Sequence, residues 1–135
     1  MILVETSAWI EYDRATGSPI DRHLTELIAA GGDLAVTEPI LMEVLAEAQD
    51  DAGWAQLRRL LTSFGWIPSE PAADFEGAAR IYRACRVNGV TPGGLIDCMI
   101  ASTALRTDAT LLTADKDFAR IADVVPLRID PALAT

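Results

Sequence analysis

Short apolar runs alternate with longer amphipathic stretches along the chain. The runs are rich in leucine and β-branched residues and are bounded by polar residues, glycine or proline, a pattern that predicts buried strands. We expect these strands over residues 2–4, 34–36, 65–68, 110–113 and 124–129. Between them, apolar positions recur every three or four residues, which predicts helices. The helices are expected after Glu5, over 38–45, 51–61, 71–87 and 97–106, and starting at 115–118.

This alternation of strands and helices predicts the α/β class. Parallel strands need crossover connections, so helices should cover both faces of a mostly parallel sheet. The chain contains no internal repeat, low-complexity tract or interdomain linker. We therefore expect one domain over residues 1–130 and a short tail over 131–135.

The longest predicted helix, over 71–87, has two distinct faces. One face carries arginines, and the other is an apolar stripe that should be buried. The stripe consists of Phe75, Ala78, Ala79, Tyr82 and Cys85. Residues 89–94 follow with three glycines and a proline, a composition that predicts a loop and the one candidate hinge of the chain.

Composition excludes several classes of protein. Of the 135 residues, 50% are hydrophobic and 23% charged, which is ordinary for a globular domain and excludes general disorder. The longest runs without a charged residue are ten residues long, too short to span a membrane. The N-terminus lacks the basic and apolar regions of a signal peptide, so we expect a cytoplasmic protein with no membrane partner.

Histidine and cysteine chemistry is not indicated. Cys85 and Cys98 lack partners at metal-site spacing and are expected to be buried, inert thiols. His23 is the only histidine and lies among polar residues, so we expect it to be solvated. Catalytic triads that need a histidine are therefore disfavoured.

The chain is acidic, with a net charge of −9, which argues against a surface that coats nucleic acid. Bound cations could offset part of this charge and attract phosphate. Ten of the eleven basic residues are arginine, and several lie close together in the sequence. Phosphate binding and solvated helix faces both remain open for these arginines, namely Arg58, Arg59, Arg80, Arg83 and Arg86.

Acidic residues follow the predicted strands at the positions where parallel sheets place their functional crevice. These residues are Glu5, Glu43, Asp97 and Asp115, with Asp117 as a fifth candidate. The aspartates could instead serve as helix caps or complement helix dipoles. Glu43 fits that alternative poorly, because it lies in an apolar helix without a basic residue three or four positions away.

An oxygen-only donor set suits Mg²⁺ or Mn²⁺ better than zinc. Hydrolysis of a phosphodiester is the matching chemistry, because such ions activate water and stabilise charge on the leaving oxygen. A phosphoacceptor receiver domain would share the length and the acidic pocket but needs a lysine at a strand end. The single lysine, Lys116, lies between two aspartates instead.

Four separated segments are familiar as a set: Met1–Tyr12, Thr37–Leu45, Gly94–Ala101 and Leu112–Phe118. In this order, they resemble the motifs of PIN-domain ribonucleases, specifically the VapC toxins of prokaryotic toxin–antitoxin pairs. The resemblance covers the chain from Met1 to about Ile129. It implies a three-layer α/β/α sandwich, a homodimer, and metal-dependent endonucleolytic cleavage of RNA, often at a tRNA or rRNA site.

The resemblance also implies roles for individual residues and partners. Glu5, Glu43, Asp97 and Asp115 match the catalytic quartet that binds Mg²⁺ or Mn²⁺. Auxiliary roles fall to Thr6, Ser7, Thr113 and Asp117. The family implies a cognate VapB antitoxin, which commonly directs an arginine towards the acidic pocket, and contact with operator DNA only through that antitoxin.

Glu5 departs from the family, which ordinarily has Asp at this position. The extra methylene moves the carboxylate by roughly 1.5 Å, and a change of rotamer could compensate. A natural variant, a deliberately weakened toxin and a partly degenerate enzyme all fit this substitution. The rival hypothesis is a catalytically weak module that acts mainly through antitoxin binding and autoregulation of its operon.

Overall fold

Four short parallel strands form the centre of the protein. The computed structural model describes residues 1–131. The strands are β1 (Ile2–Val4), β2 (Leu34–Val36), β3 (Gly65–Trp66) and β4 (Thr110–Leu112), in the sheet order β3-β2-β1-β4. Leu3 is in register with Ala35 on one side and Leu111 on the other. The predicted mostly parallel sheet is confirmed.

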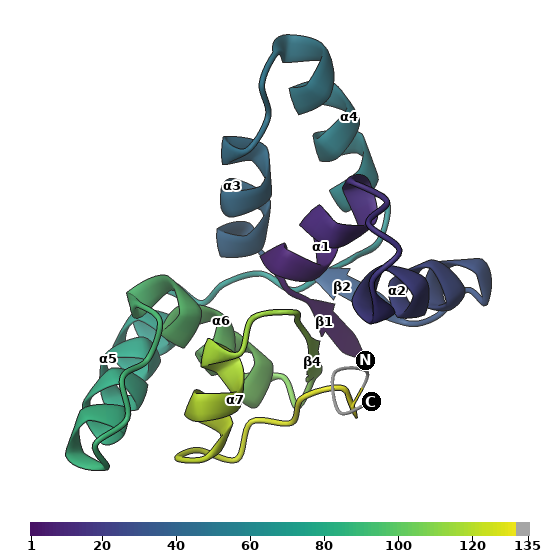
Figure 1. Ribbon diagram of the computed structural model, residues 1–135. Helices are drawn as coiled ribbons and strands as arrows, with labels where there is room; N and C mark the ends of the chain where they lie inside the picture. Colours follow the sequence, from purple (N-terminus) through teal and green to yellow (C-terminus); the bar gives the residue numbers. More distant parts are fainter. Residues whose placement is uncertain (132–135) are drawn as a thin grey trace.

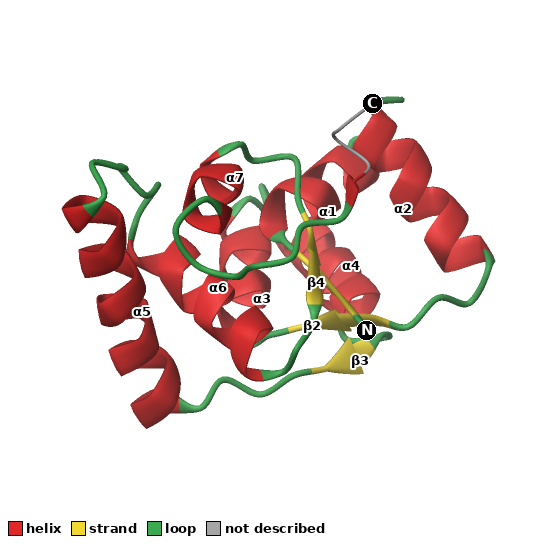
Figure 2. Cartoon of the chain, turned by 90° about the horizontal axis from the view of Figure 1, so that it is seen from below, coloured by secondary structure: helices red, strands yellow, loops and turns green. Residues whose placement is uncertain are grey.

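Seven helices flank this sheet within the described residues. They are α1 (Thr6–Asp13), α2 (Pro19–Ala29), α3 (Glu38–Ala46), α4 (Asp51–Leu61), α5 (Pro71–Val87), α6 (Leu95–Arg106) and α7 (Asp117–Ala122). In Figure 1 the strands lie between one group formed by α1, α3 and α4 and another formed by α6 and α7, with α5 outside α6. Figure 2 shows the same sheet from below, with α5 and α6 side by side. The α/β prediction is therefore confirmed.

Strands β1, β2 and β4 are mainly apolar because helices cover both faces of the sheet there, whereas the two residues of the edge strand β3 are exposed. Leu3, Val4, Val36, Leu111 and Leu112 are fully buried. Such burial removes the alternation of polar and apolar positions that a half-exposed strand would show. No helix within residues 1–131 has both the length and the apolar run needed to span a membrane.

Helix α2 was missed by the sequence prediction. Its start carries a Ser-Pro signal, with the Ser18 hydroxyl accepting a hydrogen bond from the Asp21 N–H (3.1 Å) and Pro19 in the first turn. Ile20 and Leu24 are buried one turn apart. His23 lies on this helix with Nε2 at 3.2 Å from an Asp130 carboxylate oxygen, so the prediction of a simply solvated histidine is wrong.

The strand predicted over 124–129 is also wrong. The chain turns after α7, and only Ile129 forms an isolated bridge, parallel to Leu111. Pro126 cannot donate to a ladder, which explains why β-branched neighbours do not make a strand here. Strands β3 and β4 end earlier than predicted, and α6 begins at Leu95 instead of 97. Of the predicted tail, residues 132–135 lie outside the described residues.

The buried face of α5 differs from the predicted stripe. Phe75 and Ala79 are exposed, whereas Asp74 and Ile81 are buried with Ala78 and Cys85. Cys85 and Cys98 are buried free thiols, as predicted. The arginines at 80, 83 and 86 lie on the exposed face of α5, where Arg80 pairs with Glu76 at 3.3 Å.

A buried carboxylate explains this shift and joins α5 to α6. Asp74 is fully buried and accepts hydrogen bonds from Ser102 (3.0 Å), Thr103 (3.2 Å) and both Nε and Nη2 of Arg106 (3.1 and 2.9 Å). The backbone N–H of Glu70 adds a fifth donor at 2.9 Å. This network holds the C-terminal half of α6 and thereby fixes the helix whose first turn carries Asp97.

Candidate functional site

The carboxyl ends of β1, β2 and β4 meet at one edge of the sheet and place the acidic residues there. Glu5 follows β1 directly, Glu43 lies on the helix after β2, and Asp115 follows β4. Helix α6 brings Asp97 to the same edge from the glycine-rich loop. Parallel strands always end on the same side, so chain segments distant in sequence converge.

Three aspartates form the tightest part of this site. One carboxylate oxygen from each of Asp97, Asp115 and Asp117 lies within 4.8 Å of the others, a spacing that a single cation could bridge. Asp115 Oδ1 accepts a hydrogen bond (2.9 Å) from the N–H of Asp117, the first residue of α7. Asp117 forms an ion pair with Arg120 at 2.9 Å. Gly94 and Lys116 are the N-cap residues of α6 and α7, so the helix-cap alternative is wrong for Asp97 and Asp115. Asp97 and Asp117 do lie in first turns, where their charge complements the helix dipole.

Glu5 lies at the bottom of the site, almost completely buried, at 3% exposure. Its Oε1 accepts hydrogen bonds from the Ser7 hydroxyl (2.5 Å) and the Thr113 hydroxyl (2.6 Å). Those hydroxyls themselves accept from backbone, Ser7 from the Ala114 N–H and Thr113 from the Asp115 N–H. Burial raises the pKa of Glu5, although the hydroxyl hydrogen bonds oppose this effect.

Glu43 borders the site from α3. Its Oε1 accepts a hydrogen bond from the Thr6 hydroxyl at 2.7 Å, which links α3 to the first turn of α1. Glu43 and Glu5 lie outside the group of three aspartates, but both act electrostatically on Asp97. The four residues of the expected quartet therefore surround one region. Asp117, which was expected to be auxiliary, has a carboxylate oxygen within 4.8 Å of one from Asp97.

Asp97 experiences the strongest crowding of negative charge. Burial, followed by repulsion from Asp115, Glu5, Glu43 and Asp117, raises the pKa of Asp97 to about 7. Ordinary aspartate titrates near 3.8, so the ionised form is strongly disfavoured in the protein without a counter-charge. A bound cation is one way to supply that charge.

Gly93 is a site residue that sequence analysis did not single out. A Cβ at this position would collide with the Asp97 and Asp117 carboxylates. The backbone of the 89–94 loop therefore approaches the carboxylates closely, and only glycine leaves them room. The only sequence signal was the glycine-rich composition, which indicated a loop but not what the loop touches.

We expect Gly93→Ala to weaken Mn²⁺ binding at least tenfold, because the new methyl group displaces two carboxylates from their positions. Isothermal titration calorimetry measures the affinity. Gly94→Ala is the matched control, since a Cβ there meets nothing within 4 Å and its φ of 171° is extended backbone. Equal affinities for the two variants would contradict the crowding argument.

Comparisons with known proteins show which family the chain resembles. A family profile described as the PIN domain matches residues 2–124. VapC ribonuclease Mb1587 of Mycobacterium bovis is 41% identical over 129 residues, which cover 95% of this chain and 96% of the relative. Ribonuclease VapC11 of Mycobacterium tuberculosis strain H37Rv shows the same identity and coverage.

Solved structures share the fold. A VapBC2 complex of Rickettsia felis bound to a promoter DNA fragment has a TM-score of 0.76 at 20% identity, covering 96% of this chain and 98% of that one. Mycobacterium tuberculosis VapC20, described as a Sarcin-Ricin loop cleaving toxin, has a TM-score of 0.67 at 17% identity, covering 95% and 99%. At these identities the likeness supports the fold alone.

Proposed function

This chain belongs to the PIN-domain family, among the VapC ribonucleases, and on that premise we propose that it is a metal-dependent endoribonuclease toxin that cleaves tRNA or rRNA. The observation that carries the proposal is the cluster of Asp97, Asp115 and Asp117 oxygens within 4.8 Å, bordered by Glu5 and Glu43. The 41% identity to named VapC ribonucleases over 95% of the chain supports the reaction type.

The donor set fits Mg²⁺ or Mn²⁺. It contains carboxylate oxygens only, which these hard ions prefer. Burial, followed by repulsion from the neighbouring carboxylates, raises the pKa of Asp97, and a divalent cation would balance their negative charge. We propose Glu5, Glu43, Asp97 and Asp115 as metal ligands and catalytic residues, with Asp117 auxiliary. When bound, such an ion supplies activation of water and stabilisation of charge on the scissile phosphate.

The remaining polar residues hold these carboxylates in place. Ser7 and Thr113 donate to Glu5, and Thr6 donates to Glu43, so neither glutamate is free to rotate without losing a hydrogen bond. Fixed carboxylates favour catalysis because misplacement of about 1 Å can cost on the order of a hundredfold in rate. We propose these three hydroxyls as positioning residues.

The proposal includes partners. Structural neighbours are described as VapBC complexes, among them one from Haemophilus influenzae with a TM-score of 0.71. We propose that a VapB antitoxin neutralises this chain in the cytoplasm, that the chain forms a homodimer, and that it reaches operator DNA only through the antitoxin. An arginine delivered into the carboxylate cluster would form charge-assisted hydrogen bonds and compete with the metal.

Cleavage of total cellular RNA tests the enzymatic function. We expect products with Mg²⁺ or Mn²⁺ and none with EDTA. Products that persist in EDTA would contradict metal dependence. An absence of products in every condition would favour the second candidate, the catalytically weak module, for which the specific observation is Glu5 at the position where the family has aspartate.

Glu5→Asp distinguishes a weakened site from an intact one. The present carboxylate is held against Ser7 and Thr113 and lies outside the three-aspartate cluster. Shortening the side chain by one methylene should release it from this arrangement and restore the family's ligand length. We expect Mg²⁺-dependent cleavage to rise about tenfold.

Glu5→Gln serves as the control for that experiment, since it keeps the length and removes the charge. Its cleavage should fall below that of the parent chain. If Glu5→Asp also loses activity, the glutamate is an adapted ligand and the attenuation hypothesis is wrong.

A further inference from the structure

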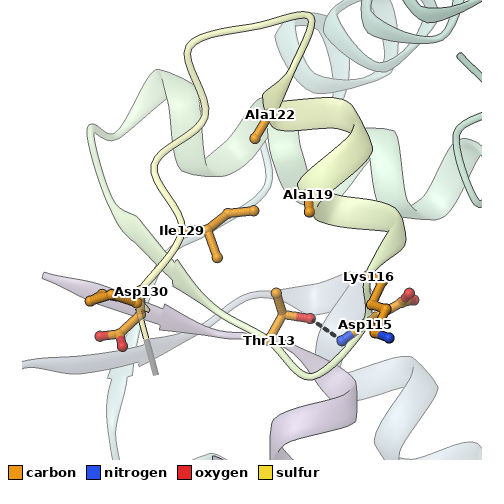
Figure 3. Close-up of a pocket in the computed structure, with 8 residues that line it drawn as sticks. Thr113, Asp115, Lys116, Ala119, Ala122, Ile129 and Asp130 are labelled. Carbon is orange, nitrogen blue, oxygen red and sulfur yellow. Dashed lines mark hydrogen bonds between the residues drawn. The ribbon is translucent and has the colours of Figure 1, made fainter. Parts of the chain in front are cut away.

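An apolar pocket of about 540 Å³ opens beside the carboxylates. It lies between α7 and the segment that leads to Asp130, as Figure 3 shows. Ala119 and Ala122 on α7 face Ile129 across the space. Thr113 and Asp115 belong to both the pocket and the candidate site, so the two are continuous.

The chemistry of the walls selects the kind of occupant. The pocket presents short aliphatic side chains, and its volume lies within the range of about 300–1,000 Å³ found for small-ligand sites. Two carboxylates, Asp115 and Asp130, are among its residues. A phosphate inside would be repelled, whereas the uncharged, flat face of a ring would displace water from apolar surface.

One positively charged residue also lines the pocket. Lys116, the only lysine of the chain, is exposed and lines the same pocket next to Asp115. A nucleotide combines a base, whose flat faces are apolar and whose edges are polar, with an anionic phosphate, and the pocket combines alanine walls with one exposed cation. The carboxylate cluster adjoins it where a neighbouring phosphodiester would lie.

We propose that this pocket receives a nucleobase of the RNA, flipped out of the strand next to the scissile phosphate. The proposal rests on the ribonuclease function and names a binding subsite for its substrate. Unstacked single-stranded bases are the usual targets of proteins that bind RNA in this way. Because the walls are aliphatic, the pocket should add affinity for RNA more than it discriminates between bases.

Nucleotide binding tests the subsite without requiring cleavage. Chemical shifts of the Ala119, Ala122 and Ile129 methyl groups should move on titration with AMP and stay unchanged with ribose 5-phosphate, which lacks the base. Ala122→Leu should fill the pocket and weaken AMP binding at least tenfold. Ala79→Leu, on the exposed face of α5, is the matched control and should bind AMP like the parent chain.

Cleavage kinetics provide the second measurement. Ala122→Leu should raise KM for RNA at least tenfold while kcat and Mn²⁺ affinity stay close to parent values, because no carboxylate is altered. If the parent chain and Ala122→Leu both cleave RNA with the same KM, the proposed base-binding subsite is wrong, but the proposed ribonuclease function stands. If the parent chain binds AMP in the pocket but cleaves no RNA, the proposed ribonuclease function is wrong, but the subsite stands.

A protein occupant would give a different result. If AMP leaves the three methyl groups unmoved, and a short peptide carrying arginine and leucine moves them, the pocket is a protein-docking site and the inference is wrong.

Discussion

Asp97→Asn should abolish RNA cleavage and, at the same time, stabilise the metal-free protein. The first effect follows because the substitution removes a carboxylate from the cluster, and loss of a proposed metal ligand should lower the cleavage rate at least a hundredfold. The second follows because burial and repulsion from four neighbouring carboxylates raise the pKa of Asp97 to about 7. The two effects have opposite signs, which a merely misfolded variant would not show.

The pH dependence of the second effect can be derived. Because the pKa of Asp97 is higher in the folded chain than the usual 3.8, the folded state binds a proton more tightly than the unfolded state between about pH 4 and 7. In EDTA the parent chain should therefore lose stability as the pH rises through this range. Asparagine removes that loss, which after the discount for solvent screening is on the order of 2 kcal/mol at pH 8, or roughly 7 °C in Tm.

Differential scanning fluorimetry measures the Tm of the metal-free protein in EDTA and of the metal-bound protein in Mn²⁺. Mn²⁺ should raise the Tm of the parent chain and have little effect on Asp97→Asn. Asp123→Asn, an exposed aspartate at the end of α7, is the matched control and should behave as the parent does. A lower Tm for Asp97→Asn in EDTA at pH 8 would show that repulsion does not dominate this site.

Asp74→Ala should destabilise the fold by about 3 kcal/mol or more. The substitution removes the shared acceptor of five donors and leaves the hydroxyls of Ser102 and Thr103 unpaired beside Arg106. Urea unfolding measures the free energy. Glu76→Ala is the control, since its ion pair with Arg80 is exposed and should contribute well under about 1 kcal/mol.

The acid side of the stability curve tests the same network. Burial raises the pKa of Asp74, but the hydrogen bonds from Arg106, the Glu70 N–H and Ser102 more than offset it and leave the pKa below the usual 3.8. The stability from Asp74 is therefore present above about pH 4 and lost as the pH falls further. In Asp74→Ala the free energy of unfolding should therefore fall less steeply as the pH drops below about 4. If the variant loses stability in acid as steeply as the parent chain, other carboxylates cause the acid unfolding.

The sequence predicted best those elements whose residues are nearly all buried. Strands β1, β2 and β4 are mostly buried, so their sequences are apolar except for the half-buried Thr110 at the start of β4, and this pattern predicts strands. Helix α2 was missed because polar residues dominate the sequence from Pro19 to Thr25, although Ile20 and Leu24 have the helical spacing. The segment over 124–129 has strand-like composition, but Pro126 and a single bridge decide its structure.

The candidate site was predictable where a general rule of topology applies. Glu5 follows β1 directly and Asp115 lies shortly after β4, and residues near strand ends converge in any parallel sheet. The proximity of Gly93 to Asp97 depends on the path of a loop, which no spacing in the sequence encodes. The same holds for Asp74, whose side-chain partners lie 28 to 32 positions away.

The two outer strands of the sheet determine how copies of this chain can associate. Beyond β4, Leu111 donates its N–H to the Arg128 carbonyl and its own carbonyl accepts from the Asp130 N–H, so that edge is occupied. The opposite edge, β3, is only two residues long. Edges this short or covered resist strand addition. Self-association should therefore proceed through helical surfaces, and a continuous intermolecular sheet, with its risk of fibrillar growth, is not expected.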